Sequence, residues 1–176
     1  MVTPHLIGTA LVLHAAVTIA ARPEVLVEGL EAAAVVGPDA VDARWCERFA
    51  QEWLVSRRGC ASASPTASDE RITACLARCS TACAAGVERA LRQDAADELL
   101  LDKATMVLAC RVSAVAQLLG CWTVTYEVMQ QTWYGPMRGP RTRVSGHLTL
   151  VLRSVQAGDT DVLAVDDDHI DAQEDR

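Results

Sequence analysis

The chain has 176 residues, of which 51% are hydrophobic, which is enough for one domain or for two small ones that share a core. Its formal net charge of −7 argues against nucleic acid or an anionic membrane as the main partner, because both require a concentrated basic surface. Since only one Phe and two Tyr are present, Ala, Val and Leu are expected to fill most of the interior.

The first apolar segment, Leu6–Ala21, contains no Asp, Glu, Lys or Arg. It is short for a transmembrane helix, which needs ~20 apolar residues, and it lacks the basic region that begins a secretory signal. We interpret it as a buried first helix, with a signal or an anchor as the alternative. No membrane insertion is therefore expected.

A second helix is predicted over Glu24–Val35, because Gly37 and Pro38 would end it. The next helix is expected after an N-cap at Asp39 and before Gly59. Its apolar residues recur at every fourth position, which places them on one face of a helix. They are Val41, Trp45, Phe49 and Trp53.

Two more helices are predicted before the first strand. Ser68 is the expected N-cap of one, and the other is expected to follow Asp94 and to end at Gly120. Residues 1–119 are therefore interpreted as a helical N-terminal domain. The inward faces of the two helices are Ile72, Cys75, Leu76, Cys79, Cys83 and Val87 in one, and Leu100, Ala104, Val107, Leu108, Val115 and Leu118 in the other.

After Cys121 the apolar residues alternate with polar ones, which is typical of half-buried β-strands. Strands are predicted over residues 122–129, 144–155 and 161–165, with a long loop over residues 130–143. Residues 120–176 are interpreted as a three-stranded antiparallel β module that ends in a short helix or a solvated acidic tail. The predicted fold class is therefore α+β.

No phosphate-binding loop, nucleophile elbow or zinc-protease motif is present, so an enzyme is not predicted. Cys75, Cys79 and Cys83 are spaced like one helix face, where cysteine acts as a small apolar residue, and we interpret them as core packing rather than as metal ligands. The segment Asp166–His169 lacks the pattern of a calcium loop. No cofactor and no metal are expected, and the odd number of cysteines, seven, favours a reduced, cytoplasmic compartment.

A module of three strands leaves two open edges and cannot shield both of its faces. We therefore predict that protein subunits complete it in a homo- or hetero-oligomer, and that Leu150→Asp would abolish this association. Aromatic residues in the Gly- and Pro-rich loop are also assigned to the partner. The predicted interface consists of Trp122, Val124, Tyr126, Val128, Trp133, Tyr134, Leu148, Leu150 and Leu152.

The segments Leu118–Val128, Pro140, His147–Ser154 and Val162–Gln173 follow one another in an order that resembles the COMM domain. The match is position by position at Trp122, Val124, Tyr126, Leu148, Leu150 and Leu152. The leucine-rich helix that closes this domain has no counterpart, since only Asp168–Arg176 remain. The resemblance covers about the last third of the chain.

The resemblance implies a non-enzymatic scaffold subunit that pairs through its β module and acts in endosomal recycling, in the cytoplasm and on endosomes. One alternative is an adaptor similar to a Tctex-type dynein light chain, which requires a fourth strand. The other is a secreted or membrane-anchored protein in which Leu6–Ala21 is the signal or anchor and the cysteines are bridged.

Overall fold

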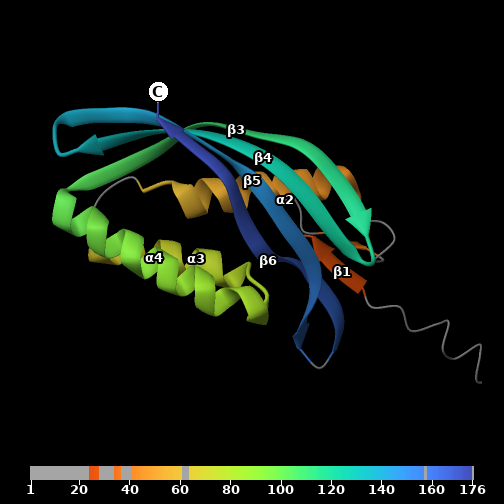
Figure 1. Ribbon diagram of the computed structural model, residues 1–176. Coiled ribbons are helices and arrows are strands. Elements are labelled where there is room, and N and C mark those ends of the chain that lie inside the picture. The colour runs from red at the N-terminus through yellow and green to blue at the C-terminus, as the bar shows by residue number, and fades with distance from the viewer. Residues whose placement is uncertain (1–23, 28–33, 37–40, 61–63, 157, 176) are drawn as a thin grey trace, which may run out of the picture.

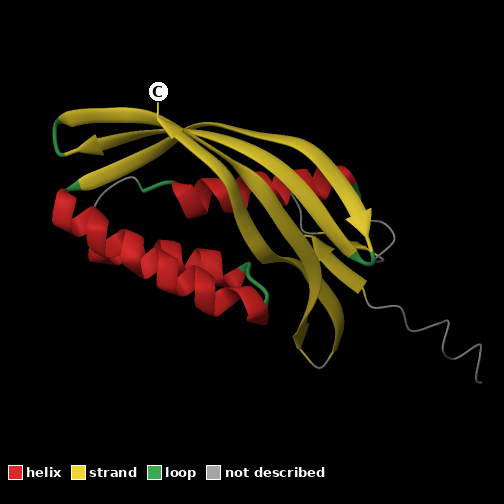
Figure 2. Ribbon diagram, viewed as in Figure 1, coloured by secondary structure: helices red, strands yellow, loops and turns green. Residues whose placement is uncertain are grey.

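The structure is a computed structural model that describes residues 24–27, 34–36, 41–60, 64–156 and 158–175. The described helices lie on one side of a curved β-sheet (Figure 1 and Figure 2). The helices are α2 (Ala43–Arg58), α3 (Pro65–Ala77) and α4 (Thr81–Leu101). The strands are β1 (Glu24–Val27), β2 (Ala34–Val36), β3 (Lys103–Leu118), β4 (Cys121–Tyr134), β5 (Met137–Gln156) and β6 (Gly158–Asp175).

The strands form one sheet in the order β2-β1-β6-β5-β4-β3. The last four strands of the chain pair with their neighbours in sequence and are antiparallel, as the short turns between them require. β1 runs parallel to β6 and antiparallel to β2, so the two short strands extend the sheet at the β6 side. β3 is therefore the edge strand at the opposite side.

The predicted helix that carries Trp45, Phe49 and Trp53 is confirmed as α2, although its N-cap is Asp42. The Asp42 carboxylate accepts the backbone N–H groups of Arg44 and Trp45 at 2.9 and 3.1 Å. Side-chain oxygens at such positions satisfy N–H groups that have no partner within the helix. Asp39, the predicted cap, lies outside the described residues, as does Leu6–Ala21.

The N-cap predicted at Ser68 is wrong, because α3 begins one turn earlier. Ser64 caps it by accepting the N–H of Ala67 at 3.2 Å, and Pro65 occupies the first helical position. In the part of the chain that the structure describes, none of the helices is long and apolar enough to span a membrane.

The helix predicted from Asp94 to Gly120 is wrong in its second half. α4 ends at Leu101, Asp102 takes a left-handed conformation with φ of 48°, and β3 follows at once. Ala and Leu in this segment favour a helix locally, but pairing with β4 along the whole of β3 outweighs that preference. The hairpin turn that joins the two strands, Leu119-Gly120, falls at the predicted domain boundary.

The prediction of a three-stranded module with a tail is also wrong. Residues 130–143, predicted as a loop, are strand on both sides of the turn at Gly135-Pro136. The acidic segment after Val165 is the second half of β6, which pairs with β5 as far as Asp175. The helix predicted over 24–35 is replaced by β1 and β2 in its described parts.

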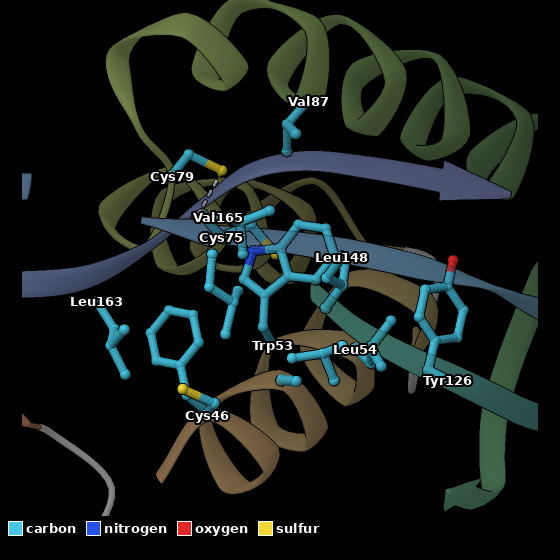
Figure 3. Close-up of a cluster of buried hydrophobic side chains, with 14 of the residues drawn as sticks. Cys46, Trp53, Leu54, Cys75, Cys79, Val87, Tyr126, Leu148, Leu163 and Val165 are labelled. Carbon is cyan, nitrogen blue, oxygen red and sulfur yellow. Dashed lines mark hydrogen bonds between the residues drawn. The ribbon is translucent and has the colours of Figure 1, made fainter. Parts of the chain in front are cut away.

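The core lies between the helices and the face of the sheet that they cover. Trp53 of α2 is at its centre, with Leu54, Leu148 and Val165 around it (Figure 3). Each of these side chains is buried, and burial of one large apolar side chain stabilises the fold by ~1.5–3 kcal/mol. The helix layer therefore closes one face of the sheet within a single chain.

Candidate protein interface

β3 is a long edge strand with few of the features that normally protect such an edge. Among the described residues only β4 pairs with it along its length. Near its start, Thr105 and Cys60 exchange two backbone hydrogen bonds of 2.7 Å, which cover that point. Two irregularities, at Val107/Ala109 and Val112/Ala114, break its register with β4, yet the strand contains no acidic residue and no proline.

Exposed apolar side chains gather along this edge. Ten large apolar residues are exposed in the described part of the chain, and nine of them lie on β3, beside it or at its two ends. Met137 belongs to this group because it pairs with Tyr134, which pairs with Lys103. We call the nine residues the β3 rim: Val55, Leu99, Leu100, Leu101, Met106, Leu108, Leu118, Leu119 and Met137.

A shallow apolar groove lies where β3 passes the end of α2. Its volume is about 380 Å³, and Val55 and Met106 of the β3 rim line it. The other lining residues are Gly59, Cys60, Ala104, Thr105, Val107 and Trp133. Large exposed apolar surfaces of this kind mark sites of protein association.

The turn between β3 and β4 contains a leucine in an unfavourable conformation. Leu119 and Gly120 have φ of 51° and 80°, the pattern of a tight hairpin turn for which Asn-Gly is preferred. A left-handed backbone costs a residue such as leucine ~1–2 kcal/mol. Because Leu119 is 94% exposed, contacts within the chain do not offset this cost, and such strain is typical of a functional position.

Leu119→Asn is expected to raise the free energy of unfolding by about 1 kcal/mol, because asparagine tolerates the left-handed conformation better than leucine. Urea denaturation of dilute protein measures this. The matched control is Leu118→Asn, since Leu118 is also exposed but has no positive φ, and it should give no gain. Equal effects of the two substitutions would contradict the assignment of strain to Leu119.

Most of the residues predicted to face a partner lie in the core of this chain. Trp122, Val124, Tyr126, Val128, Leu148 and Leu150 are buried beneath the helices. Trp133, Tyr134 and Leu152 are half-buried; Trp133 lines the groove, and Leu152 packs against the core. A partner could contact the first six only by displacing the helices, and an interface role for the other three stays a prediction.

The charged residues beneath the sheet form ion pairs that join the two layers. Arg58 of α2 donates to Asp168 of β6 at 2.9 Å, and Tyr126 of β4 donates to the same carboxylate at 2.8 Å. Burial and the neighbouring Asp168 raise the pKa of Tyr126, so its hydroxyl keeps its proton. The acidic segment predicted as a solvated tail therefore holds the helices to the sheet, since Asp166 also accepts from Ser80 at 2.6 Å.

A polar cavity of about 260 Å³ adjoins these pairs. Its arginines are all paired: Arg57 with Asp94 at 2.8 Å, Arg58 with Asp168, and Arg71 with Glu98 at 2.7 Å. No group of His, Cys, Asp and Glu in the described residues could hold a metal ion. The rings of His147 and His169 lie side by side on the open face of the sheet, with their centroids 4.9 Å apart and their planes tilted by 37°, and an oxygen of Asp171 lies 3.6 and 3.7 Å from their ring nitrogens. The ion pairs that line this cavity are therefore contacts that hold the fold together.

No family model matches the chain, and neither does any curated protein. Among solved structures, the periplasmic domain of DotI is similar with a TM-score of 0.52 and 9% identity, over 73% of this chain and 94% of that domain. The chain shares its fold. A periplasmic fragment of TraM is similar with a TM-score of 0.49 and 14% identity, over 69% of this chain and 91% of that fragment. The VirB8 protein of Agrobacterium tumefaciens is similar with a TM-score of 0.42 and 10% identity, over 73% of this chain and 88% of that chain.

These findings correct the resemblance to the COMM domain, which is wrong. The fold is shared with a periplasmic domain, so the endosomal scaffold function, and the cytoplasmic, endosome-associated location expected with it, are wrong as well. Neither alternative is favoured. The misleading signal was the alternation in β4 and β5, which many antiparallel sheets share. The β3 rim was missed because its Ala-rich strand was interpreted as a helix.

Proposed function

We propose that this chain is a non-catalytic domain that assembles with protein subunits in a periplasmic complex of the type IV secretion kind. The single observation that carries the assembly role is the β3 rim, which groups exposed apolar residues along an open strand edge. The shared fold with the DotI periplasmic domain supports the location. The pairing of the buried charges within the chain supports a non-catalytic role.

The partner that fits the β3 rim best is a second copy of the chain. Two identical strand edges can always pair antiparallel about a two-fold axis, and two-fold dimers are the commonest oligomers. The charge of the chain agrees with this choice. Each copy has a net charge of −7, whereas the only charged residues of β3 are the basic Lys103 and Arg111. The two strands that would meet therefore contribute no acidic charge to the contact.

Met106→Lys is expected to weaken self-association at least tenfold, because a lysine would have to be desolvated in the groove beside Val55. Sedimentation velocity over a range of concentrations measures the dimer constant. The matched control is Ile170→Lys: Ile170 is exposed to a similar degree, 42% against 51% for Met106, but lies on β6 away from the rim.

Two outcomes would remove the proposal of a dimer. One is a chain that stays monomeric at every concentration, which would leave the β3 rim to a different protein. The other is an equal loss of association in the Met106→Lys and Ile170→Lys variants. Thermal unfolding of both variants should stay close to that of the original chain, since exposed substitutions usually change stability by less than about 0.5 kcal/mol.

A further inference from the structure

The hairpin turn between β3 and β4 fixes which backbone groups of β3 face outward. In a two-residue hairpin, the residues that flank the turn exchange backbone hydrogen bonds with each other, and here they are Leu118 and Cys121. Along an antiparallel strand the N–H and C=O groups then point alternately toward the neighbouring strand and away from it. Each bulge of β3 adds one residue, after which the alternation resumes. Counting back from Leu118 therefore assigns the outward residues as far as the start of the strand: Gln117, Val115, Val112, Cys110, Val107 and Thr105.

The other end of the strand confirms this assignment. Thr105 exchanges two backbone hydrogen bonds of 2.7 Å with Cys60, which lies outside the ladder of β3 and β4, as an outward residue must. Cys60 therefore occupies the edge at Thr105. Of the six outward residues, Thr105 is the one whose backbone partner on this side lies in the described part of the chain. A partner strand can thus pair with β3 from Val107 to Gln117.

We propose that two copies of the chain pair along β3 in one defined register, about a two-fold axis that passes between Ser113 and Ala114. This register rests on the self-association proposed for the β3 rim. Cys110 then lies opposite Gln117 of the second copy, and Val112 lies opposite Val115 of the second copy. The axis repeats each pair, so all four outward residues are hydrogen-bonded in both copies.

A register centred on Arg111 would also pair four outward residues, those in the range 107–115, but it has two faults. It places Arg111 opposite Arg111 of the second copy, and like charges directly opposite each other destabilise a strand pair. It also brings Gln117 of the second copy to Thr105, where Cys60 already lies. The edge that Cys60 leaves open therefore favours the register centred between residues 113 and 114.

The proposed register also gives a role to the strained leucine of the hairpin turn. Arg111 faces Ala116 of the second copy, and the turn of the second copy ends beside Val107, before the position of Cys60. Leu119 of the second copy then lies opposite Leu108, next to the apolar groove that Val107 lines. A residue that is 94% exposed in the single chain would thus cover apolar surface in the dimer.

Leu119→Asn is therefore expected to weaken the dimer about tenfold, because it removes an apolar side chain from the contact. The same substitution is expected to stabilise the single chain, so unfolding cannot account for the loss of association. Sedimentation velocity of this variant and of the original chain measures the two dimer constants. An unchanged dimer constant would overturn the placement of Leu119 beside the groove.

Disulfide cross-linking of the full chain measures the register directly. Gln117→Cys places a thiol opposite the native Cys110 of the second copy, with the Cα atoms about 5.5 Å apart, a separation that a disulfide accepts. Cys121→Ser is added so that the tryptic peptide that follows Arg111 holds only the introduced cysteine. Oxidised glutathione should convert most of the chain to a covalent dimer, in which this peptide is joined to the peptide that contains Cys110.

Two matched variants in the same background are expected to give no covalent dimer through Cys110. Leu118→Cys lies next to the test position, but its side chain points to the opposite face of β3. Val112→Cys faces Cys110 of the second copy only in the register centred on Arg111. A cross-link through Val112→Cys in place of Gln117→Cys would overturn the proposed register.

Sedimentation separates the failure of the register from the failure of the dimer. A chain that dimerises in solution but gives no cross-link between Gln117→Cys and Cys110 would overturn the register and leave the self-association in place. A chain that stays monomeric at every concentration would overturn both.

Discussion

Leu150→Asp is expected to unfold the chain, not to dissociate an oligomer. Leu150 lies on β5 between Trp122 of β4 and Val165 of β6, and it is fully buried. The substitution loses ~1.5–3 kcal/mol of apolar burial and places a carboxylate without a partner in the core. The sum exceeds about 4 kcal/mol, a large part of the ~5–15 kcal/mol that stabilises a typical domain. Near-ultraviolet circular dichroism and thermal melting measure the loss of structure.

The neighbouring residue supplies the control for this substitution. Val151 is half-buried and points to the opposite face of the sheet, away from the helices. Val151→Asp should cost only about 1 kcal/mol, because water can reach the new carboxylate. If Leu150→Asp kept its near-ultraviolet spectrum and only dissociated an oligomer, the burial of this face beneath the helices would be refuted and the original interface prediction restored.

Glu98→Gln is expected to lower the free energy of unfolding by about 3–5 kcal/mol. Glu98 accepts two hydrogen bonds from Arg71, at 2.9 and 2.7 Å, and the two side chains are only 5% and 10% exposed. Glutamine keeps the shape but removes the charge, which leaves a buried guanidinium without its counterion. Urea denaturation, with m-values compared to confirm two-state behaviour, measures the change.

A surface pair of the same composition provides the comparison. Glu88 and Arg92 lie four residues apart on α4 and are largely exposed, so Glu88→Gln should cost less than about 0.5 kcal/mol. The double variant Arg71→Met with Glu98→Gln should recover part of the loss, since it removes the stranded charge. Equal effects of Glu98→Gln and Glu88→Gln would show that the buried pair contributes no more than a surface one.

These variants distinguish in experiment between residues that stabilise the fold and residues that mediate association. Substitutions beneath the helices change folding, whereas substitutions on the β3 rim, such as Met106→Lys, change association and leave folding intact. A prediction of assembly made from buried residues would have confused the two effects. The rim residues are therefore the ones to change when the partner is sought.

Some parts of the structure could be predicted from local patterns. The four-residue spacing of Trp45, Phe49 and Trp53 predicted α2, because residues at that spacing share one face of a helix. The alternation after Cys121 likewise predicted that Trp122 and Val124 share the apolar face of β4, although the chain's own helices and not a partner cover that face. The assignment of Cys75 and Cys79 to core packing is also confirmed, and Cys83 packs against that core. Their placement on one helix face is wrong, because α3 ends before Cys79 and α4 carries Cys83.

Other parts could not, because they depend on contacts between distant segments. The Ala- and Leu-rich segment 103–118 is compatible with a helix, and only pairing with β4 makes it a strand. The acidic residues Asp166 and Asp168 look like a solvated tail until Ser80 and Arg58 are placed beside them. Residues that are close to these segments in sequence do not reveal such distant partners.

The sequence alone determined which helices and strands have one apolar face and one polar face, since that property follows from the spacing of residues along a single element. Only the tertiary structure decided what covers each apolar side: the chain's own helices on the inner face of β4 and β5, and nothing in the described residues along the β3 rim. The physical reason is that the hydrophobic effect removes apolar side chains from water without specifying which segment covers them. Which segment covers each apolar face therefore depends on how the whole chain packs.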